Sequence, residues 1–258
     1  MISLRPSKNF MYKNLITDLA SRKVDVAVDA ASSGLKNRKY FNTKLYVGLD
    51  IDNGLLEKGL IKFSENADIK NPHTVAVHCD LTTVKLATGS VDLLVSSNTI
   101  EHLPAIKRLP SLVSLFDSLH SESVLILTTR KNSTYDEIKH TLLEAFDHVH
   151  EVNYRNRASR LFESLITRNG RVISINGWVR YPVLSIVKIL GFLERALSPF
   201  AQLNVDSYFV CTGPLKKGHK QNFHFGDFIQ LSNTYYRAGD MEIMQSGSAN
   251  PCAVDDNK

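Results

Sequence analysis

The feature that most constrains this chain is a series of short, almost wholly apolar segments separated by stretches with helical spacing. The apolar segments, rich in Val, Ile and Leu, occupy residues 24–30, 44–51, 73–79, 91–97 and 123–129. Apolar residues three or four positions apart, as on one face of a helix, occur at 54–63, 105–119 and 135–146. Strands that are apolar on both faces and alternate with helices form a parallel sheet covered on both sides. The pattern therefore predicts an α/β, doubly wound fold.

The 258 residues suffice for one large domain with an ample core. We expect this domain over residues 1–213, with a helix at 7–20 against the sheet edge and Ser7 as its N-cap. The remaining residues, 214–258, form a polar extension whose end has the composition of a disordered segment.

Composition excludes several classes of protein. Hydrophobic residues make up 43% and charged residues 22%, which is typical of globular domains and indicates neither a transmembrane nor a disordered chain. The three cysteines lie far apart without the spacing of zinc ligands, so we expect no metal site and no disulfide. The start MISLRPSKNFMYKNL lacks the apolar core of a secretory signal. We therefore expect a cytoplasmic location, either free or peripheral at the inner face of the membrane.

The alternation of strands and helices breaks over residues 155–203, before a last strand expected at 205–213. This insertion is expected to be helical, although its charges exclude a membrane span. An apolar stripe with helical spacing recurs at Val183, Ile186, Val187, Leu190, Leu193 and Leu197.

The insertion also concentrates positive charge. Residues 151–200 contain eight Arg and Lys against three Glu, a net charge of +5 that equals the excess of the whole chain. Arginine binds phosphate in bidentate geometry, and an amphipathic helix approached by Trp178 and Tyr181 suits a membrane surface. We therefore expect the insertion to recognise a phosphate-bearing sugar acceptor, and residues 178–200 to contact a membrane surface. The alternative is a lid helix packed on the domain, with solvated arginines.

Ligands of open parallel sheets bind beyond the carboxyl ends of the strands, so the residues at these ends are the candidates for chemistry. The first strand ends in DAASSG, residues 29–34, whose small side chains let a ligand approach the backbone, although a plain strand-to-helix turn has the same composition. The second ends at Asp50, where a carboxylate can accept from both ribose hydroxyls, and Asp52 is expected to cap the next helix. The third ends at Asp80, which either accepts from an adenine amino group or is an exposed loop acid.

The fourth strand ends in VSSNTIEHLP, residues 95–104, where two serines and an asparagine close an apolar run and an acid and a histidine follow. Together with VAVDAASSG, YVGLDID and HCDLTT, this run resembles the class I S-adenosylmethionine-dependent methyltransferases, in particular the methyltransferase type 11-like group with a DLVVSSNVLEHLP-like sequence. The resemblance covers roughly residues 23–131, and the strand at 205–213 fits the terminal antiparallel hairpin of that family. It implies a Rossmann-like, mostly parallel seven-stranded sheet in the order 3-2-1-4-5-7-6, with S-adenosylmethionine as the cofactor.

The resemblance also implies roles for individual residues. The turn after the first strand would hold the methionine end of the cofactor, the second strand end the ribose, the third the adenine, and the fourth would form a polar floor beneath the sulfonium. The residues implied are Asp29, Ala31, Ser33 and Gly34 for the methionine end, Asp50 for the ribose, Ile51, Asp80 and Leu81 for the adenine, and Ser96, Ser97 and Asn98 for the floor.

The first turn departs from the family pattern. Family members usually carry glycines two, four and six residues after the acid, where this chain has Ala31, Ser33 and Leu35. Side chains disfavour positive φ, so either the turn is reshaped with Gly34 in the unusual conformation, or the affinity for the cofactor is lower. The alternative to an enzyme is therefore a catalytically inactive methyltransferase-like module with a cofactor-binding or regulatory role.

Methyl transfer from a sulfonium is an in-line displacement, for which the protein supplies alignment, desolvation and, with a hydroxyl acceptor, a base. His102 is the candidate base, since its reference pKa of about 6.5 suits proton transfer, although a packing or capping role fits it as well. The insertion resembles those of surface-polysaccharide methyltransferases. The expected acceptor is thus an oxygen of a sugar in a glycan or glycolipid precursor, on a nucleotide or lipid-diphosphate carrier.

Two other functions fit the residues less well. A nicotinamide-dependent sugar dehydrogenase or epimerase would need GxGxxG after the first strand, which is absent, although Tyr135 and Lys139, and Tyr40 and Lys44, have the spacing of a Tyr-x-x-x-Lys pair. RNA methylation would rest on the arginine-rich insertion alone, because the sequence has no recognisable nucleic-acid-binding module. We therefore expect no nucleic-acid partner.

Overall fold

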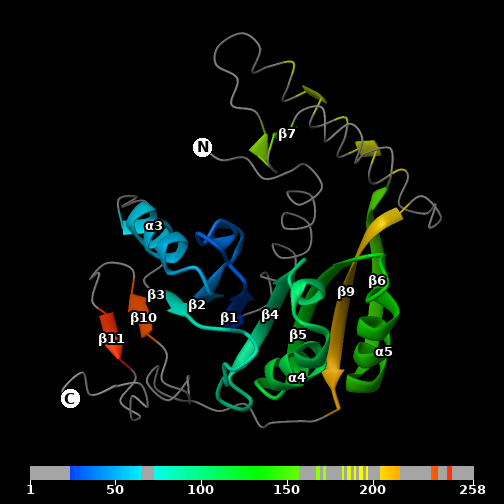
Figure 1. Ribbon diagram of the computed structural model, residues 1–258, viewed down its shortest axis with the longest axis horizontal. Coiled ribbons are helices and arrows are strands. Elements are labelled where there is room, and N and C mark those ends of the chain that lie inside the picture. The colour runs from blue at the N-terminus through cyan, green and yellow to red at the C-terminus, as the bar shows by residue number, and fades with distance from the viewer. Residues whose placement is uncertain are drawn as a thin grey trace, which may run out of the picture.

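The computed structural model is a twisted sheet with helices on its faces (Figure 1). The structure describes residues 24–64, 73–156, 167–168, 171–172, 182, 185–186, 189, 192–193, 196, 204–215, 234–237 and 243–245. The helix expected at 7–20, with Ser7 as its cap, lies outside these residues. So does most of the insertion, including Val183, Val187, Leu190 and Leu197 of the expected stripe.

The sheet has the strand order that the sequence predicts. Its central strands are β1 (Val24–Ala30), β2 (Thr43–Asp50), β3 (His73–His78), β4 (Val91–Ser97), β5 (Leu119–Arg130), β6 (Phe146–Asn156) and β9 (Asn204–Pro214). They lie in the order β3-β2-β1-β4-β5-β9-β6, with β1 to β5 paired in parallel and β9 antiparallel to both of its neighbours. Because β9 is the seventh strand of this series, the predicted order 3-2-1-4-5-7-6 is confirmed.

The sheet continues beyond the expected strands. β10 (Thr234–Arg237) pairs antiparallel with β3, and β11 (Ile243–Gln245) pairs antiparallel with β10. Both come from the polar extension, for which the sequence predicts no strand. Edge pairing is made by backbone groups, so it needs no apolar periodicity that a sequence pattern would reveal. Within the insertion, β7 (Thr167–Arg168) and β8 (Arg171–Val172) form a separate two-stranded pair.

Three α-helices join the strands in the described part of the chain. They are α3 (Asn53–Ser64), α4 (Ala105–Phe116) and α5 (Tyr135–Ala145), accompanied by the short 3-10 helices η2 (Arg38–Tyr40) and η3 (Ile100–His102). The expected cap of α3 is confirmed, because the Leu55 amide donates to Asp52 Oδ1 at 3.0 Å and the Leu56 amide to the Asp52 carbonyl at 3.2 Å.

Apolar side chains fill both faces of the sheet, because successive residues of a strand point to opposite sides. Val28 and Val47 belong to a cluster completed by α4 and α5, whereas Ala27 and Tyr46 belong to a cluster completed by Leu56 and Leu60 of α3. The doubly covered sheet explains why these strands read as continuous apolar runs.

The contact between α3 and the turn after β1 leaves no room for a side chain at Gly59. A Cβ there would lie 2.8 Å from both the carbonyl carbon and the carbonyl oxygen of Gly34. We expect Gly59→Ala to lower the free energy of unfolding by about 1–3 kcal/mol, although alanine is the better helix former. Gly54→Ala is the matched control, since its Cβ would meet Asp52 Oδ1 at an ordinary 3.6 Å. Urea unfolding measures both, and equal stabilities would show that α3 is not seated on the turn.

Candidate functional site

The carboxyl ends of the central strands bring the predicted site residues to one edge of the sheet. Ala30 at the end of β1 is in register with Leu49 of β2 on one side and with Ser96 of β4 on the other. The next residues of these two strands, Asp50 and Ser97, therefore lie at the same edge. Asp50 is in turn in register with His78, two residues before Asp80.

The turn after β1 keeps the backbone conformation that glycine favours, but without glycine. Ala31, Ser33 and Leu35 have φ angles of 60°, 54° and 52°, whereas Gly34 is not in the positive-φ region. The expectation that Gly34 takes the unusual conformation is therefore wrong. Each left-handed residue with a side chain costs about 1–2 kcal/mol, so this turn is strained at three alternate positions.

Neighbouring contacts hold the strained turn against β2. The Ser32 amide donates to the Leu49 carbonyl at 2.8 Å, and the Ser33 amide donates to Asp50 Oδ2 at 2.6 Å. Leu35 is fully buried, and its Cδ2 lies 2.3 Å from the place of a Cβ on Gly48. Gly48, a glycine inside a strand, thus makes room for Leu35, and the burial of Leu35 offsets part of the strain.

Asp29 lies beneath the turn and supports it. The side chain is buried, and its Oδ2 accepts hydrogen bonds from Asn37 Nδ2 at 3.1 Å and from the Tyr46 hydroxyl at 2.8 Å. Asn37 precedes η2 and Tyr46 is in β2, so the Asp29 carboxylate joins three consecutive elements. Its contacts place Asp29 as an anchor of the turn on which the methionine end of a cofactor would rest.

The end of β2 presents a carboxylate already oriented by backbone amides. Asp50 is 9% exposed, and its Oδ1 accepts from the Asp52 amide at 3.0 Å while its Oδ2 accepts from Ser33. Each carboxylate oxygen can accept a second hydrogen bond. The neighbouring side chain of Ile51 is 68% exposed, an apolar surface beside the carboxylate.

The end of β3 is tied to the end of β2. The Cys79 amide donates to the Asp50 carbonyl at 2.9 Å, and Asp80 Oδ1 accepts from the Thr82 amide at 2.8 Å. Leu81 is 6% exposed and packs in the core, so of this residue the backbone rather than the side chain is the group that a ligand would meet.

The end of β4 forms a polar floor together with Thr128 of β5, which the sequence analysis did not single out. The Asn98 amide donates to the carbonyl and to Oγ1 of Thr128, at 3.1 and 2.9 Å, and Thr128 Oγ1 lies 3.3 Å from Ser97 Oγ. Asn98 has a φ of 51°, and the buried hydroxyl of Ser96 has no hydrogen-bond partner in the described part. The sequence does carry a signal for Thr128, because Thr128 and Thr129 end the fifth apolar segment, residues 123–129, as polar residues end the fourth.

Beyond the floor, η3 carries the acid and the histidine. His102 is exposed, whereas Glu101 is buried, and neither carboxylate oxygen of Glu101 has a hydrogen-bond partner among the described residues. Burial raises the pKa of the Glu101 carboxyl, while His102 and Arg130 act in the opposite direction. The sequence identifies an acidic residue at position 101, but it does not indicate that the side chain is buried.

The two Tyr-x-x-x-Lys pairs have structural partners. The Tyr135 hydroxyl donates to Glu151 Oε1 and Lys139 Nζ lies 2.9 Å from Glu151 Oε2, so both side chains hold α5 against β6. Lys44 pairs with Asp25 at 3.0 Å near the amino ends of the strands, away from the candidate site. These contacts disfavour a dehydrogenase reading of either pair.

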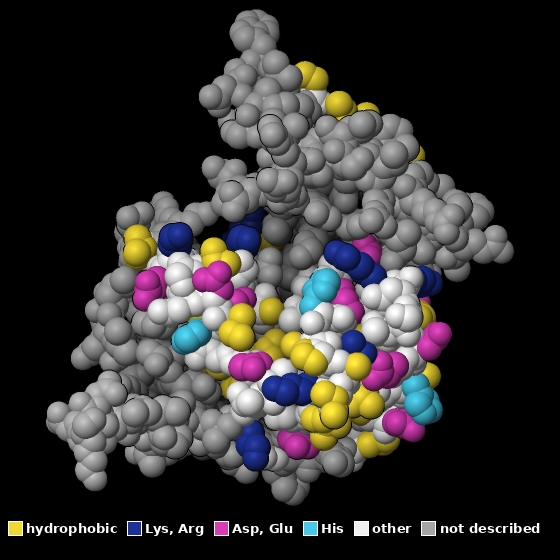
Figure 2. Space-filling view, in the orientation of Figure 1, with side chains coloured by type: hydrophobic (Ala, Val, Ile, Leu, Met, Phe, Trp, Pro, Cys, Tyr) yellow, Lys and Arg dark blue, Asp and Glu magenta, His cyan; other side chains and the backbone are white. Residues whose placement is uncertain are grey.

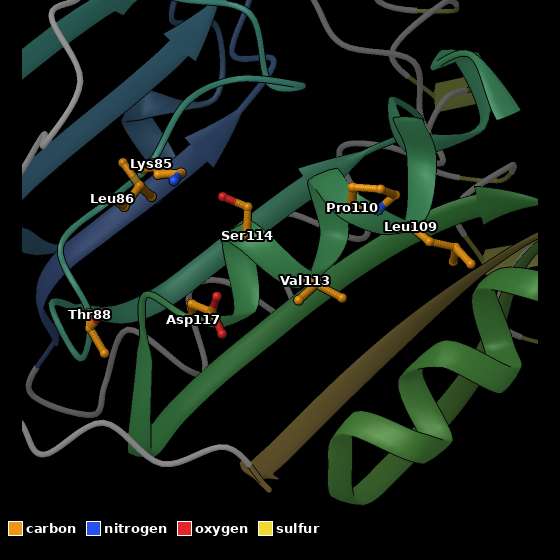
Figure 3. Close-up of a pocket in the computed structure, with 8 residues that line it drawn as sticks. All are labelled: Lys85, Leu86, Thr88, Leu109, Pro110, Val113, Ser114 and Asp117. Carbon is orange, nitrogen blue, oxygen red and sulfur yellow. The ribbon is translucent and has the colours of Figure 1, made fainter. Parts of the chain in front are cut away.

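A separate groove of about 590 Å³ lies between α4 and the connection from β3 to β4 (Figure 3). Its lining residues are Lys85, Leu86, Thr88, Leu109, Pro110, Val113, Ser114 and Asp117. Residues 85–88 precede β4, and α4 runs back from the end of β4, so the groove opens toward the amino ends of the strands. Apolar side chains gather over this helix in Figure 2, with Ile106 86% exposed. The groove is thus distinct from the carboxyl edge.

The described residues contain no helix long and apolar enough to span a membrane. They also contain no group of three or more His, Cys, Asp or Glu side chains arranged to hold a metal ion.

The strain of the turn after β1 can be tested one position at a time. We expect Ala31→Gly and Ser33→Gly each to raise the free energy of unfolding by about 1 kcal/mol, because glycine relieves the left-handed strain and the backbone hydrogen bonds remain. Leu35→Gly should instead lower it by about 2 kcal/mol or more, because a fully buried side chain is removed. Chemical denaturation measures all three. Destabilisation by the first two changes would contradict the strained conformation.

Comparison with known proteins gives a consistent result. Residues 28–127 match the family model described as "Methyltransferase domain". No curated protein sequence matches the chain. Among solved structures, N-methyltransferase NodS from Bradyrhizobium japonicum WM9 is similar with a TM-score of 0.52 at 10% identity, over 81% of this chain and 97% of that one.

Two further structures have the same fold. The [4+2]-cyclase SpnF has a TM-score of 0.52 at 9% identity, over 83% of this chain and 82% of that one. The CurJ carbon methyltransferase has a TM-score of 0.51 at 10% identity, over 80% of this chain and 54% of that one. At these identities the likenesses show the fold alone. The chain therefore has a Rossmann-like fold, and its residues 28–127 are similar to a methyltransferase domain, a kind of domain that uses S-adenosylmethionine as its cofactor.

Proposed function

We propose that this chain binds S-adenosylmethionine at the carboxyl edge of its sheet and transfers the methyl group to an oxygen of a sugar in a glycan or glycolipid precursor. The observation that carries the cofactor part is the convergence of Asp50, Asp80 and the floor formed by Ser97, Asn98 and Thr128 at one edge. These groups come from strands that lie far apart in the sequence.

The residues present fit an adenosyl group. The two oxygens of Asp50 each keep an acceptor site for a ribose hydroxyl, and the exposed side chain of Ile51 offers an apolar surface for the adenine. Asp80 is suited to accept from the adenine amino group. The turn from Ala31 to Gly34 would take the methionine end, because its path follows the glycine-type conformation despite its side chains.

The chemistry at the edge requires alignment more than reactive side chains. When bound, S-adenosylmethionine supplies an electrophilic methyl group on a positively charged sulfur. Ser97, Asn98 and Thr128 hold one another by hydrogen bonds, so their oxygens form a fixed floor that needs no reorganisation during transfer. Such a preorganised surface would hold the sulfur in position for transfer to an acceptor.

A catalytically inactive module is the competing proposal, and the turn after β1 bears on it. Three residues with side chains keep the conformation of the glycine turn, so the altered sequence has not removed the cradle on which cofactor binding depends. The fold alone does not decide the reaction, since the [4+2]-cyclase SpnF has the same fold. Cofactor binding and turnover must therefore be measured separately.

The acceptor part of the proposal is supported by charge. The segment 151–200 carries a net charge of +5 and is rich in arginine, which suits a phosphate-bearing sugar on a nucleotide or lipid-diphosphate carrier. The proposal includes a cytoplasmic location, with peripheral contact at the inner face of the membrane.

Exposed apolar side chains in the insertion support this membrane contact. Residues 182, 185–186, 189, 192–193 and 196 are helical, and Ile186, Ile189 and Phe192 are 41%, 57% and 71% exposed. Their spacing of three residues places them along one side of the helix. A row of large apolar side chains in an arginine-rich segment suits the interface of an anionic bilayer.

The ribose assignment predicts the outcome of an Asp50→Ala substitution. We expect the affinity for S-adenosylhomocysteine, measured by calorimetry, to fall at least about a hundredfold, because both ribose hydroxyls lose their acceptor. Asp80→Ala should weaken it less, because stacking and backbone contacts remain. Asp52→Ala is the matched control: it removes the cap of α3 and costs about 1 kcal/mol of stability, but leaves the affinity unchanged.

Turnover separates the two proposals once binding is established. Methyl transfer from radiolabelled S-adenosylmethionine to nucleotide sugars by the wild type, with none by Asp50→Ala, supports the enzyme. Binding of S-adenosylhomocysteine without transfer to any sugar acceptor supports the inactive module, and absence of binding would contradict both.

The membrane contact predicts that the exposed apolar row binds lipid. The variant with Ile186, Ile189 and Phe192 all changed to Ser should bind phosphatidylglycerol-containing vesicles at least about tenfold more weakly than the wild type in co-sedimentation. Ile106→Ser, which removes an exposed apolar side chain of α4, is the control and should bind like the wild type. Equal binding by all three proteins would exclude the insertion as the contact.

A further inference from the structure

Glu101 is a buried carboxylate that has no hydrogen bond from any other residue that the structure describes. Glu101 is 9% exposed, and neither Oε1 nor Oε2 has a hydrogen-bond partner in the described part of the structure. Asp50 at the same edge is equally buried, but both of its oxygens accept backbone amides. A buried polar group without a partner is costly, so its presence calls for a functional reason.

Arg108 fixes the backbone on both sides of Glu101. Its Nε donates to the Ile100 carbonyl at 3.3 Å and its Nη2 to the Leu103 carbonyl at 3.1 Å, while Nη1 pairs with Glu137 at 2.8 Å. The guanidinium thus bridges Ile100, the first residue of η3, and Leu103, which follows η3, and anchors both to α5. Glu101 is held in place by the fold rather than by contacts of its own carboxylate.

The charges that act on Glu101 show on which part of the edge it lies. They belong to the adjacent His102, to Arg130 at the end of β5, and to Asp206 of β9. Arg130 and Asp206 are in register across the β5–β9 pair. Glu101 therefore lies beside the ends of β4, β5 and β9, next to the floor of Ser97 and Thr128.

This part of the edge is the side that an acceptor must occupy. The ribose and adenine groups of the cofactor are assigned to the ends of β2 and β3, and its methionine end to the turn after β1. With these assignments the methyl group would face the remaining part of the edge, at the ends of β4 and β5 and the start of β9. An acceptor that attacks in line with the breaking bond would approach from there.

We propose that Glu101 is the general base of the reaction, an inference that rests on the proposed function. The acceptor oxygen forms a bond to the methyl carbon as the carbon–sulfur bond breaks. The electron pair of that bond passes to sulfur, which leaves neutral S-adenosylhomocysteine, and the proton of the acceptor hydroxyl passes to the Glu101 carboxylate. The unused hydrogen-bonding capacity of Glu101 is thereby reserved for the acceptor.

The surroundings of Glu101 suit this role. Burial raises the pKa of its carboxyl and outweighs the lowering by its own backbone amide, His102 and Arg130, while the charge of Asp206 acts in the same direction as burial. A carboxylate with a raised pKa is a stronger base than an exposed glutamate. His102, the base suggested by the sequence, is exposed by comparison.

Sinefungin provides a test that requires no knowledge of the acceptor, because it carries an amino group where S-adenosylmethionine carries the transferable methyl. The Glu101 carboxylate should favour this cation over neutral S-adenosylhomocysteine. We expect the ratio of the two affinities, measured by calorimetry, to fall about tenfold in E101Q while the affinity for S-adenosylhomocysteine is unchanged. In the wild type the preference for sinefungin should weaken as the pH is lowered and Glu101 takes up a proton; in E101Q it should not.

The matched control is Glu122→Gln, which neutralises an exposed carboxylate of β5 and should leave the ratio as in the wild type. E101Q should also melt at a higher temperature than the wild type at pH 7. The folded state holds the proton of Glu101 to a higher pH than the unfolded state, so ionisation costs stability that the neutral side chain recovers.

Three results would overturn the inference, and they can be told apart. An unchanged ratio in E101Q, with normal binding of S-adenosylhomocysteine, would show that Glu101 does not act on the methyl side. A lower melting temperature of E101Q would show that the carboxylate has a structural partner. Failure of the wild type to bind S-adenosylhomocysteine would remove the proposed function and this inference with it.

Discussion

The hydrogen bond from the Ser33 amide to Asp50 Oδ2, at 2.6 Å, is the interaction on which the candidate site depends. It joins the turn after β1 to the end of β2, and the other oxygen of the same carboxylate accepts from the amide that leads into α3. The Asp50 carboxylate thereby orients the backbone of both segments, and each of its oxygens can still accept a hydrogen bond from a ligand. Parallel pairing of the strands places the turn after β1 and the end of β2 at one edge of the sheet, and the Asp50 carboxylate fixes their positions relative to each other.

The same hydrogen bond explains how a turn without the usual glycines survives. Ala31, Ser33 and Leu35 adopt a left-handed conformation that is unfavourable for each of them, so the turn would open if nothing held it. Asp50 holds it at Ser33, Asp29 supports it from below through Asn37 and Tyr46, and the buried Leu35 closes it over Gly48. Strain at the edge is offset by packing and hydrogen bonding in the layer beneath.

The sequence predicts those parts of the fold that a local pattern encodes. Apolar runs located the central strands, and their ends located Asp50, Asp80 and Asn98, because the period of a buried strand and its end are visible in the residues themselves. Positive φ at Ala31 was not predictable, since the residue type argues against it and only contacts from β2 enforce it. The roles of Thr128 and of the buried Glu101 could not be predicted, because they depend on which strand ends meet in the fold. β10 could not be predicted either, because it pairs with the edge of the sheet through backbone groups that any extended segment has.

The carboxyl edge divides into two parts that differ in hydrogen bonding. At the ends of β2 and β3, Asp50 and Asp80 accept backbone amides, and at the end of β1 Asp29 accepts from the side chains of Asn37 and Tyr46. These hydrogen bonds orient the acids before a ligand arrives, which suits a cofactor bound in one fixed pose. Near the ends of β4, β5 and β9 the fold encloses a carboxylate, Glu101, without satisfying it. An unsatisfied buried charge opposes folding, and this cost is the reason for assigning Glu101 to a bound partner. The boundary between the two parts, the floor of Ser97 and Thr128, is where a methyl group would pass from cofactor to acceptor.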